Sequence, residues 1–514
     1  MFKFRWGVVV RLVVVVILFV FLAEPLLANY RSAQAYFQRR DYVTAASAFY
    51  NALASTSKRE IARKSEWGLA QSLQKLEFYY SASKYYSDIV RRGPSGKNPF
   101  FKSALEQLGK VNSRVQIGQS QVVKLFRKGI NVGSVPRSAR GFFYYYQGLE
   151  SFKDGRRSKA LKQFAKVPSN SSYYDKARFH MGVVAAAQGK NTRAIQIFES
   201  VRRRAPSGER GEFVRELTNL NIARIKYGGK KYRDSLRYYR FIPRDSDNWL
   251  QSLFEASWAF FMLQKHNNVL GNSHTILSPF FINRFYPEIY ILKAITYLKM
   301  CDTKKVRKSV NDFQRRYKPI FNDIRDMLRA YRDDYRGFYK LITDYRRGRL
   351  RKYRKASSIL DHLMRTDSYK EGVDTTRFSD RELARLSRVR RWGSSGLRDE
   401  LEGFLRGKKS LAAKDAGRRL FRKATGFFKY LKELSEQTIR IKTEMLLKDL
   451  DDLRKELNIP VKGKKGDFIG GLQPLKVGQK LEYWPFEGEY WEDELGYYVY
   501  NIESKCGKKR KKKK

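Results

Sequence analysis

The chain has 514 residues, enough for about three domains or one long array of repeats. Its hydrophobic fraction of 42% can bury a large core, which excludes a wholly disordered protein. The 106 Lys and Arg residues outnumber the 51 Asp and Glu residues, giving a net charge of +55. Only seven of the positive charges lie in the last eight residues, so the basic character belongs to the whole chain. The two cysteines, Cys301 and Cys506, exclude a disulfide-rich scaffold.

The first thirty residues carry the pattern of an export signal. Lys3, Arg5 and Arg11 precede an apolar run over residues 12–23, which would measure about 18 Å as a helix. A bilayer span needs about 20 residues, so the run fits a secretory signal that is removed after Ala28. The alternative is an uncleaved anchor. We therefore expect residues 1–28 to be a signal peptide or an N-terminal anchor, and the protein to be periplasmic or associated with the cell envelope.

Two segments in the first half of the chain repeat with a period of 34 residues. Residues 142–167 and 177–201 carry the same residue types at five positions, and Pro206 follows the second segment. The matched pairs are Gly148 and Gly182, Gly155 and Gly189, Ala160 and Ala194, Phe164 and Phe198, and Val167 and Val201. This pattern resembles the tetratricopeptide repeat, whose unit of 34 residues forms two antiparallel helices.

Each matched position has a physical role in a helical hairpin. A small residue such as Gly148 lets the second helix approach the first, and Gly155 supplies the left-handed conformation that ends a helix. Ala160 is small where the helices cross, and Phe164 fills the space between units. Pro206 stops the second helix of the later unit.

Weaker copies of the unit extend the repeat on both sides. The first has Ala33, Ala45 and Phe49, the second Ala70, Ala82 and Tyr86, and the later ones Ala223, Ser235, Tyr239, Ala294, Val306 and Val310. We count about six units, with degenerate helical pairs near residues 100–135 and 250–280. The pattern predicts an all-α fold, a right-handed tetratricopeptide-like α-solenoid over residues 29–319. An ordinary helical protein with aromatic core stripes is the alternative, but the period, the turn glycines and the prolines recur together.

The second half of the chain loses the period after Pro319 but keeps helical character. We expect a basic helical region over residues 320–458, in which residues 346–355 hold seven basic side chains. Residues 367–380 have the composition of a loop, with Ser379 or Asp380 as the N-cap of the next helix. Residues 425–457 predict a long helix. A short coiled-coil seam there is an alternative that the small number of heptads does not establish.

The C-terminal segment is the most unusual local sequence. A Gly- and Lys-rich linker over residues 459–480 leads into a strip of aromatic and acidic residues over 481–506, predicted to be extended or β-like, and a basic tail over 507–514. Either the strip docks on the chain's own helices, or it captures a partner. The candidate partner-binding residues are Trp484, Phe486, Tyr490 and Trp491.

The sequence offers no constellation of catalytic or metal-binding residues. The four histidines lack metal-site spacing, and His180 is expected to be a packing or surface residue. Cys301 and Cys506 could pair in an oxidising compartment, but we expect free thiols because Cys301 is predicted to face the core. We therefore predict no catalytic residue, no cofactor, no metal and no small-molecule substrate.

The resemblance implies a non-enzymatic scaffold that binds peptides or partner helices along a groove. Residues 274–301 and 483–506 are also similar to secreted tetratricopeptide proteins associated with gliding motility in Gram-negative bacteria. We therefore expect a protein-interaction scaffold of the bacterial cell envelope, with other envelope proteins or peptides as partners. The alternative is a protein that binds a polyanion, namely nucleic acid, lipopolysaccharide or a wall polymer, through its basic surface. An anionic membrane is a further candidate for contact. Nucleic acid is a poor candidate because an exported chain meets little of it.

Two other interpretations stay open at this point. The basic charge can be a compositional bias, with most of the Lys and Arg side chains on solvated helix faces. An enzyme domain over residues 320–460 is the remaining class, and the lack of a His, Cys or Gly-loop constellation weighs against it.

Overall fold

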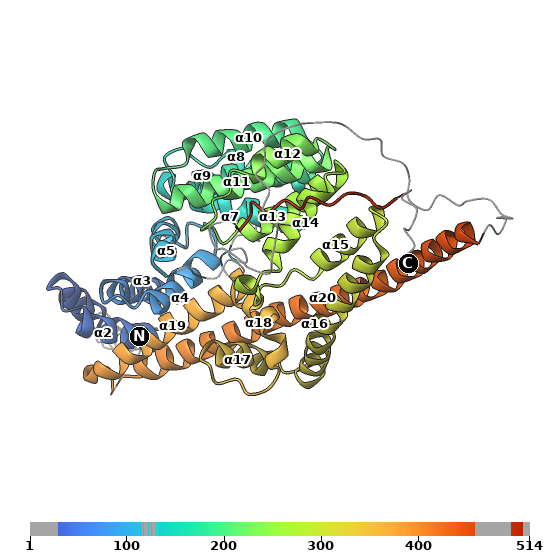
Figure 1. Ribbon diagram of the computed structural model, residues 1–514. Helices are drawn as coiled ribbons and strands as arrows, with labels where there is room; N and C mark the ends of the chain where they lie inside the picture. Colours follow the sequence, from blue (N-terminus) through green and yellow to red (C-terminus); the bar gives the residue numbers. More distant parts are fainter. Residues whose placement is uncertain are drawn as a thin grey trace, which may run out of the picture. The chain divides into compact units, whose positions relative to one another are not determined.

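The computed structural model describes residues 29–115, 117, 122, 125, 130, 132–393, 395–457 and 495–506 (Figure 1). The described residues form helices and connecting loops and contain no strand, so the predicted all-α helical repeat fold is confirmed. The predicted signal segment 1–28, the linker 459–480 and the basic tail 507–514 lie outside the described residues.

Successive helices are joined by short turns into hairpins. Residues 29–38 precede α2 (Tyr42–Ser55), and the later pairs are α3 (Arg59–Lys75) with α4 (Tyr79–Arg91), α7 (Arg140–Lys153) with α8 (Arg157–Ala165), α9 (Tyr174–Ala187) with α10 (Asn191–Arg204), α11 (Glu209–Gly228) with α12 (Tyr232–Tyr239), α13 (Trp249–Met262) with α14 (His266–Ile276), and α15 (Glu288–Lys299) with α16 (Thr303–Ala330). Helix α5 (Phe101–Val115) follows α4.

The remaining helices lie in the second half of the chain. They are α17 (Tyr335–Arg346), α18 (Ser357–Met364), α19 (Asp367–Arg388) and the 60-residue α20 (Leu397–Glu456). Short 3-10 helices occupy Val132–Ser134, Arg137–Ala139, Pro279–Phe281, Arg354–Ala356 and Arg390–Trp392. Pro319, after which the period is lost, lies inside α16. No helix in the described part of the chain combines the length and the apolar character that crossing a bilayer requires.

The chain divides into two compact units. Unit 1 comprises Met1–Val184 and Lys370–Ala416, and unit 2 comprises Ala185–Tyr369 and Gly417–Lys514. Each unit therefore combines hairpins of the first part of the chain with a segment of the C-terminal helices.

The hairpin turns share one backbone geometry. In seven turns a residue with positive φ stands two positions before the second helix, namely Arg40, Glu77, Gly155, Gly189, Lys230, Gln264 and Cys301. In the turn of Gly155, the Gly155 N–H donates to the Phe152 carbonyl at 3.0 Å and the Arg156 N–H donates to the Ser151 carbonyl at 2.8 Å. These two bonds form a Schellman motif, which satisfies carbonyls at the end of the first helix. Gly155 and Gly189 both have φ of +75°.

The turn sets the register of the core on both sides. In four hairpins, three positions counted from the positive-φ residue are buried and hold residues of the same size. Small residues lie seven positions before it (Ala33, Ala70, Gly148 and Gly182) and five positions after it (Ala45, Ala82, Ala160 and Ala194). Large aromatic residues lie nine positions after it (Phe49, Tyr86, Phe164 and Phe198). Gly148 has no room for a side chain, because a Cβ atom there would lie 2.5 Å from Cε1 of Phe164. Pro206 is exposed just after α10.

His180 packs in the core of unit 1. Its ring stacks on Phe164 with centroids 5.5 Å apart and lies 5.8 Å from the ring of Tyr145. Burial, with a smaller contribution from the charge of Lys176, lowers the pKa of His180 to about 4. His180 is therefore a neutral packing residue at pH 7.

We predict that His180→Phe makes the fold less sensitive to acid. A base whose folded-state pKa is about 4 instead of 6.5 contributes stability that is complete above pH 6.5 and is lost as the pH falls towards 4. Urea unfolding measures how far the free energy of unfolding falls between pH 7.5 and pH 4.5. We expect this fall to be smaller in the variant than in the wild type, by about 2 kcal/mol. An equal loss in both proteins would contradict the assignment.

The predicted loop over residues 367–380 is wrong, because α19 runs through it. In unit 1 its buried face carries Gly372, Thr375, Ser379, Glu382 and Leu386, spaced three and four residues apart as on one side of a helix. Most of these side chains are small or polar, so the segment lacks the apolar periodicity by which helices are recognised. Ser379 lies within the helix and caps nothing. The predicted long helix over 425–457 is confirmed, and it starts earlier, at Leu397.

Glu382 of α19 caps helix α4 from about 300 positions away in the sequence. Its carboxylate accepts the N–H groups of Tyr80 at 2.6 Å and Ser81 at 3.1 Å, and the hydroxyl of Ser81 at 2.8 Å. The N-cap residue of α4, Phe78, has no side-chain acceptor of its own. Burial raises the pKa of Glu382 to about 7, and these hydrogen bonds oppose that rise. Glu382 therefore supplies from α19 the acceptor that a helix N-terminus needs.

Two further contacts fix the C-terminal helices in unit 1. Trp392 is fully buried, donates its indole N–H to the Val43 carbonyl at 2.9 Å and packs against Phe78. The ammonium of Lys408 lies 4.2 Å from the ring centroid of Tyr80, and burial lowers its pKa to about 8. The segment 370–416 is therefore part of the core of unit 1.

We expect Glu382→Ala to destabilise the protein by about 1–3 kcal/mol, because it leaves the buried N–H groups of Tyr80 and Ser81 without an acceptor. Urea unfolding followed by circular dichroism measures the change. The control is Glu402→Ala, which removes an exposed carboxylate paired with Arg406 on α20. We expect the control to change stability by less than about 0.5 kcal/mol.

Helix α20 packs on unit 2 through an aromatic face beyond residue 417. Phe427 contacts the ring of Phe285 at 5.2 Å and that of His362 at 4.9 Å, and Phe428 stacks on Phe321 at 4.6 Å. Gly417 permits a close approach, because a Cβ atom there would lie 1.7 Å from the Tyr335 carbonyl oxygen.

Candidate interaction sites

The predicted partner-binding residues Trp484, Phe486, Tyr490 and Trp491 lie outside the described residues, as does the predicted cleavage site at Ala28. The rest of the aromatic strip, residues 495–506, is described, and we call it the C-terminal strap. It carries no strand and belongs to unit 2.

Glycines allow the strap to lie directly on α14. A Cβ atom on Gly271 of α14 would lie 1.6 Å from the carbonyl oxygen of Tyr498, and one on Gly496 would lie 2.5 Å from Cζ2 of Trp249. Gly496 also has φ of +92° and donates its N–H to the hydroxyl of Thr275 at 2.9 Å. The backbone of the strap thus contacts the helix surface with no side chain between them.

His274 and Asn267 of α14 hold the middle of the strap. Tyr498 meets the His274 ring edge-on with centroids 4.7 Å apart, and the hydroxyl of Tyr500 lies 3.1 Å from His274 Nδ1. Burial is the main cause that lowers the pKa of His274 to about 4. Asn267 accepts the N–H of Tyr500 on its carbonyl and that of Ile502 on its side chain. The described part of the strip therefore docks on the chain's own helices, one of the two arrangements that the sequence left open.

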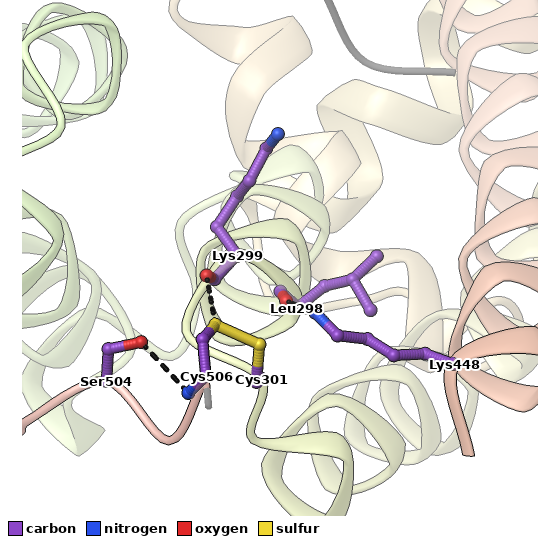
Figure 2. Close-up of a disulfide and its surroundings, with 6 residues drawn as sticks. All are labelled: Leu298, Lys299, Cys301, Lys448, Ser504 and Cys506. Atoms are coloured by element: carbon purple, nitrogen blue, oxygen red, sulfur yellow. Dashed lines mark hydrogen bonds between the residues drawn. A yellow bond between two sulfur atoms is a disulfide. The ribbon is translucent and has the colours of Figure 1, made fainter. Parts of the chain in front are cut away.

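A disulfide between Cys301 and Cys506 closes the strap onto the turn between α15 and α16 (Figure 2). The prediction of free thiols is therefore wrong. Cys301 is the positive-φ residue of its hairpin turn, with φ of +56°, and is only partly buried, so it does not face the core. The sequence held a signal for this. Cys301 stands seven residues after Ala294 and five before Val306, the same spacing that separates Gly155 from Gly148 and Ala160.

Charged and main-chain contacts surround the disulfide. Lys505 forms an ion pair with the buried Asp302 at 2.8 Å, and its N–H donates to the Met300 carbonyl at 2.9 Å. Asp302 also caps α16 by accepting the N–H of Lys305. On the other side, Lys448 of α20 donates to the Leu298 carbonyl at 3.1 Å (Figure 2). The last turn of α15 is thus bound by both the strap and α20.

We predict that reduction of the disulfide destabilises the protein. A bond that closes a sequence separation of 205 residues restricts the unfolded chain, and its loss should cost about 2–4 kcal/mol. Urea unfolding with and without dithiothreitol measures the change. The double variant Cys301→Ser with Cys506→Ser should unfold like the reduced protein and ignore the reductant. An unchanged midpoint for the reduced wild-type chain would contradict the prediction.

A separate groove in unit 1 lies at the C-terminal ends of α3 and α5 and has a volume of about 620 Å³. Its lining is mostly polar and basic: Gln71, Gln74, Lys75, Glu77, Tyr79, Gln107, Lys110, Val111, Ser113 and Arg114. Gln74 donates to Gln107 across the groove at 3.0 Å and accepts the hydroxyl of Tyr86 at 2.5 Å. The hydrogen bond between the two glutamines ties α3 to α5.

The groove carries a positive charge. Among the lining residues, Lys75, Lys110 and Arg114 are cations and Glu77 is the one acid. Lys110 pairs with Glu106 at 3.4 Å and Glu77 with Arg385 at 2.9 Å, so Lys75 and Arg114 supply the excess of positive charge. Gln71 and Gln107 present amides, which donate and accept hydrogen bonds. No cluster of three or more His, Cys, Asp or Glu side chains suited to a metal occurs among the residues that the structure describes.

Comparisons with known proteins give no family. No family model matches the sequence, and no curated protein matches it. The chain is similar to two solved structures with low TM-scores. The apo form of RapI has a TM-score of 0.30 at 10% identity, over 74% of this chain and 98% of that chain. The apo form of the quorum sensor NprR from B. thuringiensis has a TM-score of 0.29 at 13% identity, over 75% of this chain and 99% of that chain. The helical repeat fold is therefore established by the hairpins of this chain and not by these similarities.

Proposed function

We propose that the protein is a non-enzymatic interaction scaffold of the bacterial cell envelope, which binds acidic peptide segments of partner proteins. The groove between α3 and α5 carries the proposal. In this groove a solvent-accessible hollow, amide side chains and an excess of cations coincide.

The lining suits an extended peptide. A peptide main chain presents N–H and C=O groups at every residue, and the amides of Gln71 and Gln107 can pair with both. Lys75 and Arg114 lie at the ends of α3 and α5, where they would attract carboxylates of the bound segment. The hydrogen bond between Gln74 and Gln107 holds the two walls in place before a ligand arrives, which lowers the entropy cost of binding.

The envelope location is supported by two independent features. The basic and apolar N-terminal segment has the order of an export signal, and the disulfide between Cys301 and Cys506 is a bond that persists in oxidising compartments. A place in a motility or envelope-assembly complex is the narrower part of the proposal. It rests on the resemblance of residues 274–301 and 483–506 to secreted tetratricopeptide proteins of gliding bacteria.

The net charge of +55 favours a second candidate, a protein that binds lipopolysaccharide, a wall polymer or another polyanion over a wide basic surface. The two candidates differ in their dependence on salt. Binding of a polyanion by counterion release at many sites weakens steeply with salt, whereas a peptide held by main-chain hydrogen bonds and two charged side chains should respond less steeply. They differ also in which residues matter. Charge reversal inside the groove should weaken peptide binding, whereas charge reversal elsewhere on the basic surface should weaken the binding of a polyanion equally.

We predict that Lys75→Glu with Arg114→Glu weakens binding of fluorescein-labelled acidic peptides by about tenfold or more, because it reverses two charges in the groove. Fluorescence anisotropy on the mature chain measures the affinity. The matched control, Lys58→Glu with Lys102→Glu, makes the same charge change at exposed residues outside the groove and should leave the affinity within about twofold. Equal losses in both variants, with a steep dependence on salt, would favour the polyanion candidate instead.

A photo-crosslinking amino acid at Ser113 of the groove then identifies the partner in intact cells, with Lys102 as the matched position outside it. The proposal expects a discrete envelope protein that crosslinks at Ser113 and not at Lys102. Crosslinks to polymer or lipid at both positions would contradict it.

A further inference from the structure

The last part of α20 carries two apolar stripes, and only one of them packs against the rest of unit 2. The first consists of Leu431, Leu434, Thr438, Ile441 and Met445, spaced alternately three and four residues apart, and all five are buried in unit 2. The second, which we call the outer seam, consists of Ile439, Thr443, Leu446, Leu450, Leu453 and Leu457 at the same alternating spacing, and all six are exposed.

The outer seam has the pattern of a coiled-coil interface. Alternating steps of three and four residues are the a and d positions of a heptad, here with Thr443, Leu450 and Leu457 at a and Ile439, Leu446 and Leu453 at d. The exposed fractions of the five apolar side chains lie between 47% for Leu453 and 66% for Leu457. A contiguous apolar stripe of this kind on a protein surface marks a docking site.

The charges along this segment indicate another helix and not an anionic surface as the partner. Residues 439–457 hold five basic and five acidic side chains, so the segment is neutral in a chain whose net charge is +55. Helices that bind anionic membranes carry Lys and Arg on their polar face with few acids. The neutral, mixed-charge face here is that of a helix in a coiled coil.

The flanking charges select a second copy of this chain. In a parallel two-stranded coil the g residue of one helix faces the e residue five positions later on the other. Asp449 occupies g and Arg454 occupies e, so two copies in register would place each Asp449 opposite the partner's Arg454, twice by symmetry. One oxygen of the Asp449 carboxylate lies 3.7 Å from Arg307 of the same chain, and a carboxylate can accept from a second arginine with its other oxygen. An antiparallel pair in which Leu450 packs on the partner's Leu446 would instead place the two Asp449 side chains together and Arg440 beside the partner's Arg454, which is repulsive.

The helix is already built before it dimerises. A free helix of 19 residues is marginally stable in water, but this segment is the end of a 60-residue helix held on unit 2 by Lys442 to Gln314, Arg307 to Asp449 and Lys448 to Leu298. Association therefore does not have to order the helix. We propose that the outer seam of α20 joins two copies of this chain in a parallel coiled coil, at a site separate from the peptide groove.

Sedimentation equilibrium of the mature chain tests the proposal. We expect a dimer for the wild type, and a dissociation constant raised by about tenfold or more in Leu450→Asp and in Leu453→Asp. Leu411→Asp is the matched control, because Leu411 is an equally exposed leucine of α20 outside the seam. Circular dichroism confirms that each variant is folded. A monomeric wild type, or a dimer that survives both seam variants, would overturn the proposal.

Two further measurements test the parallel arrangement. Thr443→Cys and Leu457→Cys, made separately, should each form a disulfide-linked dimer under mild oxidation, since a positions face each other in register; Glu444→Cys at b should not. Arg454→Asp should weaken the dimer, since it would place an acid opposite the partner's Asp449. Crosslinking of neither a-position cysteine, or an unchanged dimer in Arg454→Asp, would overturn the parallel pairing.

Discussion

The reversal of the chain between the two helices of a hairpin determines where the core side chains of that hairpin fall. One residue in the left-handed conformation ends the first helix, and the second helix starts two residues later. Because an α-helix has a fixed rotation per residue, this geometry alone decides which later positions face the partner helix. The small residues at five positions after the turn and the large ones at nine positions after it are consequences of that single constraint.

This constraint also explains how far the sequence could predict the fold. The period of 34 residues was recognisable because Gly155 and Gly189 supply the left-handed turn with a residue type that signals it. The turns at Arg40, Glu77, Lys230, Gln264 and Cys301 adopt the same conformation with side chains that give no such signal. In those hairpins only buried residues carry the register. After Gln264 and Cys301 even the order of a small and then a large residue is lost, with Val269 and Ser273, and Val306 and Val310, at the two positions. This is why the outer units are weaker in the sequence although their turns have the same geometry.

The features that the sequence did not predict depend on contacts between distant residues. Helix α19 buries small and polar groups such as Thr375 and Ser379, so its hydrophobic periodicity is absent although its packing is helical. The cap that Glu382 gives to α4 joins residues about 300 positions apart, so no local sequence pattern predicts it. The groove between α3 and α5 likewise forms only when Gln74 and Gln107 face each other from these two helices. That Cys301 does not face the core could have been predicted, because the repeat register already placed it at a hairpin turn.

The capping of α4 by Glu382 has a consequence for how the chain folds during its synthesis. In an ordinary repeat array each unit contacts only its neighbours, so the first units can fold while later ones are still being synthesised. Here the first hairpins obtain a helix cap and a buried tryptophan from residues 382 and 392. The amino-terminal hairpins must therefore wait, incomplete, until almost four hundred residues have emerged, and a nascent chain of this protein is a natural client for a chaperone throughout that interval.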